Sequence, residues 1–276
     1  MGYVDYDEDI LKHVQQVELS ILKDFVDICN ENDLEYFLYG GTALGAVRHS
    51  GFIPWDDDID VAMFRKDYEK FLAIMEKKNI PKYKMLNVNT EKDYFLYFSK
   101  MMLRSTYFEE WWVKQVDFNV GINIDIFPLD NIPENKFKRS ILTMGCRFFD
   151  KLSTLSVIKI ENLSKTQALI ANTLHFLLKT FKIHSSLFNG ICLYLMKKYE
   201  NEHTNKICDF SALNFPQIYD KKDFTPAKNI KFENMEAKIS NNIDSILTQI
   251  YGDYMKIPPV EERYNHLTEN IDFGEY

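Results

Sequence analysis

The stretch that decides the fold is GGTALGAVRHSGFIPWDDDID, residues 40–60. Its two glycines follow the short apolar segment 36–39 and precede a helical pattern, so the chain passes there from a strand into a helix. At the other end, residues 58–63 alternate acidic and apolar side chains, which predicts a strand with Asp58 and Asp60 on the same face. A strand, a helix and a second strand in close succession indicate a mixed α/β core.

The acidic end of this stretch points to a divalent cation. Four of the five residues from 56 to 60 are Asp, and carboxylates this close repel one another unless they bind a metal or take up protons. Asp58 and Asp60 would present oxygen ligands to one Mg²⁺ or Mn²⁺. Asp56 would continue the row, whereas Asp57 would face away. An exposed acidic loop is the alternative, but the apolar residues beside the acids favour a strand.

The other end of the stretch suits a phosphate. Gly40 and Gly41 allow backbone N–H groups to approach an anion, and the N-terminus of the following helix adds to the attraction. Arg48 would form a fork to phosphate oxygens, or else a surface ion pair with one of the acids.

Two further candidates lie on strands expected in the same sheet. Asp125, in the alternating stretch 122–127, would complete a three-carboxylate cluster and bind the metal or accept a proton from a hydroxyl. The alternative is an Asp that begins a turn at Pro128, although Asp130 fills that role better. Lys100 would balance phosphate charge, or is an ordinary solvated lysine.

Composition divides the rest of the chain. Residues 134–200 are helical in pattern and carry 11 Lys and Arg residues against four Asp and Glu residues, a net charge of +7. We therefore expect a catalytic core at 1–133, a helical, locally basic subdomain at 134–208 and a C-terminal segment at 209–276 that packs back on the core. The basic, apolar helices suit a peripheral contact with anionic lipid, and a plain helical subdomain with solvated lysines is the alternative.

Composition also excludes several classes of protein. The 276 residues are 46% hydrophobic and 27% charged, as in an ordinary globular protein, and the net charge of −8 argues against a general nucleic-acid binder. The four cysteines form no CxxC motif, and the first residues show no basic region followed by an apolar one. No run of about 18 uncharged apolar residues occurs. We expect a cytoplasmic protein with reduced thiols.

The motifs resemble a known family. Residues 40–60 closely resemble the signature of the LicD family of phosphocholine transferases, which includes the fukutin-related proteins. The resemblance continues in INIDIFPLDNIP at 122–133 and in FENMEAKISNNIDSILTQIYGDYMKIPPVEERYNH at 232–266, so it brackets nearly the whole chain. Ser50 stands where the family often has a second glycine.

The resemblance implies a nucleotidyltransferase-like fold. With the helical middle, we expect an α+β protein in which a mixed sheet core carries flanking helices and an inserted helical subdomain. The family's Asp-x-Asp corresponds to Asp58 and Asp60, its later carboxylate to Asp125, and its Gly-Gly turn to Gly40 and Gly41.

The resemblance also implies an activity. The family transfers phosphocholine, or a related phospho-alcohol, from a CDP-activated donor such as CDP-choline to a hydroxyl of a cell-surface glycan, with release of CMP. Lipopolysaccharide and teichoic acid are such glycans. A lipid-linked acceptor would place the protein at the inner face of the plasma membrane.

Choline poses a separate recognition problem, because its quaternary ammonium is best held by aromatic faces with a carboxylate nearby. The sequence YFEEWW at 107–112 offers both, and Trp111 is the candidate contact. Packing of Trp111 and Trp112 in the core or a lid is the alternative. Two other functions stay open: nucleotidyl transfer, which would release pyrophosphate, and non-catalytic binding of a choline-bearing glycan, for which we would expect a degraded acid cluster.

Overall fold

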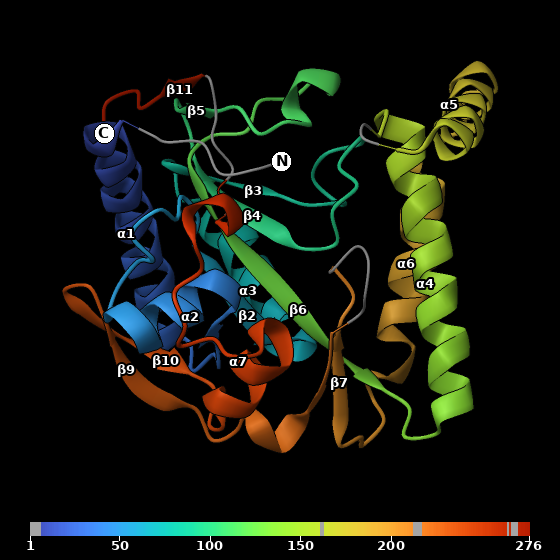
Figure 1. Ribbon diagram of the computed structural model, residues 1–276. Helices are drawn as coiled ribbons and strands as arrows, with labels where there is room; N and C mark the ends of the chain where they lie inside the picture. Colours follow the sequence, from blue (N-terminus) through green and yellow to red (C-terminus); the bar gives the residue numbers. More distant parts are fainter. Residues whose placement is uncertain (1–6, 161–162, 212–216, 264, 266–269) are drawn as a thin grey trace.

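A computed structural model describes residues 7–160, 163–211, 217–263, 265 and 270–276. Its core is a seven-stranded mixed sheet, in which five strands follow the order β1-β2-β6-β4-β3 and β7 extends β6 toward β8 (Figure 1). Neighbours β2 and β6 are parallel, and the other pairs in this sheet are antiparallel. The strands are β1 (Phe37–Leu38), β2 (Asp60–Phe64), β3 (Tyr83–Leu86), β4 (Ser99–Leu103), β6 (Asn123–Ile132), β7 (Lys206–Asp209) and β8 (Gln217–Asp220).

Strand β6 is the central strand of the sheet and pairs with three others. Its first half pairs with β2 and β4, and its second half pairs with β7. The turn expected at Pro128 is wrong, because the strand runs through this residue, which lies opposite Met63 of β2. Asp130 does not begin a turn either. It accepts hydrogen bonds of 2.7 and 2.8 Å from Arg65, and both side chains are buried, so the ion pair fastens β6 to the helix that follows β2.

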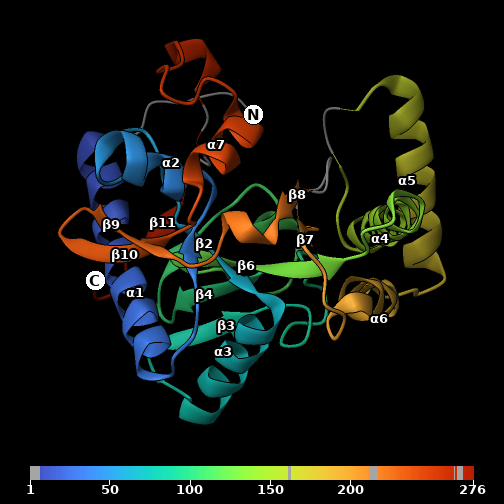
Figure 2. The same ribbon diagram turned by 90° about the horizontal axis from the view of Figure 1, so that it is seen from below.

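Helices cover both faces of the sheet. Figure 2 shows α1 (Glu8–Glu31) and α3 (Arg65–Lys78) on one face, and α2 (Gly40–His49) and α7 (Ile243–Tyr251) on the other. The side chain of Asp7 caps α1 by accepting the backbone N–H groups of Asp9 and Ile10. The apolar residues of α1 recur at helical spacing and pack in the main core. The mixed sheet and its flanking helices confirm the predicted α+β fold.

The C-terminal part of the chain adds strands as well as α7. A hairpin of β9 (Lys228–Phe232) and β10 (Met235–Ile239) lies beside β1 and α2, and β11 (Ile271–Asp272) pairs with β5 (Tyr107–Phe108). At the hairpin turn, Glu233 donates its N–H to the Ser50 carbonyl at 2.8 Å, so the hairpin holds the loop that leads to the acids. Short 3₁₀ segments are η1 (Val113–Gln115), η2 (Lys197–Tyr199), η3 (Lys221–Asp223) and η4 (Val260–Glu262).

The middle of the chain is helical, as expected from its pattern. It consists of α4 (Lys136–Val157), α5 (Lys165–Thr180) and α6 (Ser185–Met196), which stand to one side of the sheet (Figure 1). Asn189 of α6 joins this unit to the core, because its amide donates to the Tyr94 carbonyl at 2.9 Å and accepts from the Tyr97 hydroxyl at 3.0 Å. The domain boundaries proposed above stay predictions.

Two further features bear on the sequence analysis. All four cysteines are buried and have free thiols. Among the described residues, no helix combines the length and the hydrophobicity that crossing a membrane requires.

Candidate active site

Three predicted site residues lie side by side near the start of the parallel strands β2 and β6. Asp60 of β2 lies directly beside Asp125 of β6, and Asp125 lies directly beside Lys100 of β4. Because neighbours in register share a face of the sheet, these three residues form one row across three strands.

Lys100 is buried within this row. Its Nζ lies 2.8 and 3.0 Å from the two carboxylate oxygens of Asp125 and 2.9 Å from Oε1 of Glu110. Burial alone would lower the pKa of Lys100, but the charges of Asp125 and Glu110 raise it above its ordinary value. The ammonium is therefore charged and compensates two carboxylates, so Lys100 is not an ordinary solvated lysine.

Asp58 lies before the strand rather than in it, because β2 begins at Asp60. One carboxylate oxygen from each of Asp56, Asp57 and Asp58 lies within 4.8 Å of the others. The expectation that Asp57 faces away is wrong, because strand alternation does not apply in this loop, and Asp57 is buried. Neither Asp60 nor Asp125 belongs to this close group.

The charges of this loop fit a divalent cation. Burial raises the pKa of Asp56 well above its ordinary value, and the charges of Asp58, Asp57 and Asp60 raise it further. The nearby side chain of Asp58 adds to this rise, so Asp56 favours the form that holds a proton. A cation would take the place of that proton, and a set of carboxylate oxygens is the donor set that Mg²⁺ and Mn²⁺ prefer.

The two glycines bring a helix end against these acids. Gly40 and Gly41 form the first turn of α2, and Gly40 has a φ of +50°. A Cβ on Gly40 would lie 2.6 Å from Oδ2 of Asp60, and one on Gly41 would lie 3.0 Å from Oδ2 of Asp56. The absence of side chains therefore lets the N-terminus of α2 pack directly beside the carboxylates.

Arg48 lies near the acids but is engaged elsewhere. Its Nη1 donates to the carbonyl oxygen of Tyr254 at 2.8 Å, and its Nε donates to Nε2 of His49 at 3.0 Å. Partial burial lowers the pKa of Arg48, while the charge of Asp56 opposes this shift. Arg48 therefore holds the C-terminal segment beside the site.

The structure separates the two tryptophans of the aromatic stretch. Trp112 is buried, and its Nε1 donates to Oε2 of Glu110 at 2.9 Å, which connects it to Lys100. Trp111 is 39% exposed. The packing alternative thus holds for Trp112, and the surface position leaves Trp111 accessible to a ligand.

Two residues near the acids were missed by the sequence analysis. Glu18 of α1 is buried, and its Oε2 has no hydrogen-bond partner. Burial raises its pKa, as do the charges of Asp58 and Asp57. Glu18 lies on the apolar face of α1, and a charged residue on such a face was the available signal.

Tyr251, the last residue of α7, is the second of these residues. Partial burial raises the pKa of Tyr251, and so do the charges of Asp60, Asp56 and Asp58. Its only signal in the sequence was its place in the YGDY part of the C-terminal motif.

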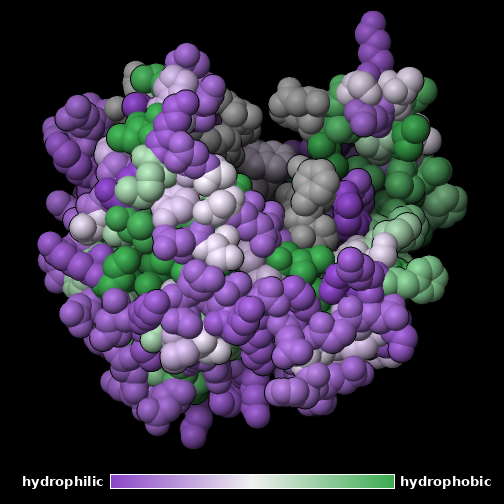
Figure 3. Space-filling view, turned by 60° about the horizontal axis from the view of Figure 1, so that its bottom comes forward, coloured by the Kyte–Doolittle hydropathy of each residue, from purple (hydrophilic) through white to green (hydrophobic). Residues whose placement is uncertain are grey.

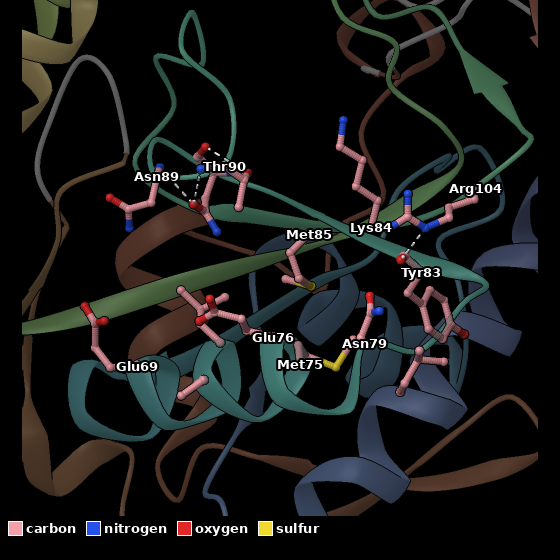
Figure 4. A pocket seen from close by; sticks show the side chains of 14 residues that line it. Glu69, Met75, Glu76, Asn79, Tyr83, Lys84, Met85, Asn89, Thr90 and Arg104 are labelled. Carbon is pink, nitrogen blue, oxygen red and sulfur yellow. Dashed lines mark hydrogen bonds between the residues drawn. The ribbon is translucent and has the colours of Figure 1, made fainter.

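The structure has a small cavity within the site and a larger one outside it. A small cavity of about 30 Å³, large enough for one water molecule or ion, lies among the acids. It is lined by Glu18, Asp57, Asp58, Ile59, Lys100, Phe108, Glu110, Asn123 and Asp125. A larger cavity of about 500 Å³ lies between α3 and β3, where Arg104 Nε donates to the Tyr83 carbonyl at 2.9 Å (Figure 4). None of the predicted site residues lines it.

A match to a known family covers the predicted residues of this site. Residues 33–144 match the family described as LicD/FKTN/FKRP, nucleotidyltransferase domain. The match contains the Gly-Gly turn, the acidic loop and the row of Asp60, Asp125 and Lys100. Residues 33–144 form a LicD-family domain. The resemblance to the LicD family is thereby confirmed.

Individual relatives extend the comparison beyond the LicD-family domain. The chain is 28% identical over 266 residues to "Lipopolysaccharide cholinephosphotransferase LicD" of Haemophilus influenzae, which covers 93% of this chain and 95% of that protein. It is 33% identical over 107 residues to "Uncharacterized protein RP689" of Rickettsia prowazekii, covering 32% and 39% of the two chains. It is 40% identical over 42 residues to the human "Ribitol 5-phosphate transferase FKRP", covering 15% and 8%.

Proposed function

We propose that this protein is a metal-dependent transferase that moves phosphocholine, or a related phospho-alcohol, from a CDP-activated donor to a hydroxyl of a cell-surface glycan and releases CMP. The LicD-family domain and the Haemophilus relative support a transferase. The observation that carries the proposal is the crowding of four aspartates of residues 56–60 beside a glycine-lined helix N-terminus.

The donor set supports the metal part of the proposal. Asp56, Asp57 and Asp58 would hold Mg²⁺ or Mn²⁺, with Asp60 beside them at the start of β2. When bound, the ion would neutralise negative charge on the donor diphosphate and on the departing CMP.

The remaining residues have roles that follow from their contacts. The N-terminus of α2 at Gly40 and Gly41 binds a phosphate of the donor. Lys100 fixes the carboxylate of Asp125, and Asp125 orients the acceptor hydroxyl and takes its proton. The acceptor oxygen then bonds to the phosphorus that carries the alcohol, and the bond from that phosphorus to the CMP oxygen breaks.

The exposed Trp111 supplies an aromatic face for choline. Trp111→Ala is expected to weaken binding of CDP-choline about fivefold and to leave binding of CDP-glycerol unchanged, because glycerol carries no cation. Calorimetric titration with both donors measures the difference. Equal losses for the two donors would remove Trp111 from choline recognition.

The transfer itself is tested by measuring CMP release from CDP-choline, CDP-ethanolamine and CDP-glycerol, with Mg²⁺ and with a chelator. We expect Mg²⁺-dependent release from at least one donor and a loss of about 100-fold or more in Asp58→Asn. Asp33→Asn is the matched control, because Asp33 is exposed and its backbone φ of +52° also suits Asn. Full activity of Asp58→Asn would overturn the assignment.

A second candidate is nucleotidyl transfer, which the description of the matching domain favours. In that reaction a nucleoside triphosphate loses pyrophosphate and the nucleotide is transferred to the acceptor. Release of pyrophosphate from a triphosphate, with no CMP from any CDP-alcohol, would replace the first proposal by this one.

A further inference from the structure

The helical unit α4–α6 presents large apolar side chains to solvent. In α4 these are Phe137, Ile141, Met144 and Phe148, with exposed fractions of 56–74%. Their spacings of four, three and four residues align them in one stripe along the helix. The residues that α4 buries, Leu142 and Cys146 among them, lie on its opposite side. Helix α4 therefore has two apolar faces, and the described part of the chain covers one of them.

Helix α5 repeats this arrangement. Its buried residues are Ala171 and Leu178, whereas Leu169 and Phe176 are exposed by 70% and 66%. Ile170 and Leu177 widen the exposed face. Figure 3 shows the result: hydrophobic residues gather over the helical unit at the right of the view, while hydrophilic residues dominate the rest of this face.

The charge around these faces is mainly positive. Exposed lysines at 136, 138 and 151 stand on both sides of the α4 stripe, and the span 134–200 carries a net charge of +7. The rest of the chain carries −15, because the whole chain carries −8. An apolar stripe bordered by lysines matches a surface in which an anionic layer covers an apolar interior. A second copy docked through the same face would instead bring two basic surfaces together.

We propose that the helical unit α4–α6 docks on the surface of an anionic lipid bilayer. The exposed side chains of α4 and α5 enter the boundary between head groups and acyl chains, and the bordering lysines bind lipid phosphates. This proposal does not depend on the donor or on the chemistry proposed for the acidic site.

Sedimentation of the full chain with lipid vesicles tests the proposal. We expect binding to vesicles of phosphatidylglycerol and phosphatidylcholine in equal amounts, weaker binding at raised salt, and little binding to phosphatidylcholine alone. The double variant Phe137→Ser/Phe148→Ser and the double variant Lys136→Gln/Lys138→Gln should each reduce the bound fraction at limiting lipid about tenfold. These residues are exposed, so the fold should persist, and circular dichroism checks this.

Met255→Ser/Ile257→Ser is the matched control, since it removes two exposed apolar side chains outside the helical unit. It should bind vesicles as the wild type does. The proposal is overturned if the wild type ignores anionic vesicles, or if the Phe137/Phe148 variant binds them equally well. A dimer in analytical ultracentrifugation that this variant disperses, without vesicle binding by the wild type, would assign the surface to a second copy.

Discussion

Lys100 illustrates how much of the site's stability depends on one side chain. The residue is 3% exposed, and its ammonium lies between Asp125 and Glu110. Removing one partner of a buried ion pair leaves uncompensated charge, so Lys100→Met should lower the free energy of unfolding by about 3–5 kcal/mol in urea denaturation. Lys84→Met is the control, because its pair with Glu91 is partly exposed and is worth about 1 kcal/mol or less. Equal losses in the two variants would contradict the buried pairing.

Asp150 sets a pH dependence away from the site. It is buried in α4, and its Oδ1 has no hydrogen-bond partner. Burial raises its pKa from 3.8 to about 7, although Lys151 opposes the shift. Because the folded state holds the proton more tightly, the stability from this group is complete below about pH 4 and is lost as the pH rises toward 7.

The variant Asp150→Asn removes this dependence. It should unfold like the wild type near pH 4 and should be more stable by up to about 4 kcal/mol near pH 8, at about 1.4 kcal/mol per pKa unit. Urea denaturation at the two pH values measures the change, with the exposed Asp117→Asn as control. The same stability difference at both pH values would contradict the assignment.

Among the secondary-structure elements, α2 ends in a strained residue. Ser50 has a φ of +57°, a left-handed conformation that is unfavourable for a residue with a side chain but not for glycine. Its backbone N–H donates a hydrogen bond to the Gly45 carbonyl. Ser50→Gly should therefore raise the free energy of unfolding by about 0.5–1 kcal/mol, and Ser50→Ala should give no such gain. Urea denaturation of both variants checks this, and an alanine variant as stable as the glycine variant would refute it.

The elements that the sequence predicts well are those whose signals are local. The spacing of Val14, Val17, Ile21 and Phe25 indicates α1, and the alternation around Asp125 indicates the start of β6. Strands β7 and β8 were not predicted as strands, because both are short and β7 joins the sheet through β6, which is distant in sequence. The hairpin of β9 and β10 was missed although its two strands are adjacent in the chain. Pro128 predicted a turn because a local rule was applied where pairing with β2 prevails.

The same division holds for the candidate site. The aspartates and glycines were recognisable because their residue types and spacing are typical of cation binding and phosphate binding. Glu18 and Tyr251 were not, since only the tertiary fold brings α1 and α7 to the acids. The close group of Asp56 to Asp58 also depends on the loop conformation, which alternation does not describe.

For the molecule as a whole, the crowded acids predict that divalent cations stabilise the fold. A cation that binds only the folded state adds about 2.7 kcal/mol to the free energy of unfolding when its concentration is a hundredfold above the dissociation constant. Melting temperature should therefore rise with Mg²⁺ or Mn²⁺ relative to a chelator, and Asp57→Asn should reduce the rise by half or more. Asp33→Asn should keep it. An unchanged melting temperature for the wild type in millimolar Mn²⁺ would contradict a cation site in this loop.

The residues near the acids are synthesised at different times, because they lie far apart in the chain. Glu18 and the four aspartates leave the ribosome early, whereas α7, which brings Tyr251 to them, is made near the end. We expect the nascent chain to carry the acidic loop without Tyr251 beside it until α7 has been made. A message truncated before residue 243 would therefore yield every aspartate of the loop but not the tyrosine whose pKa they raise.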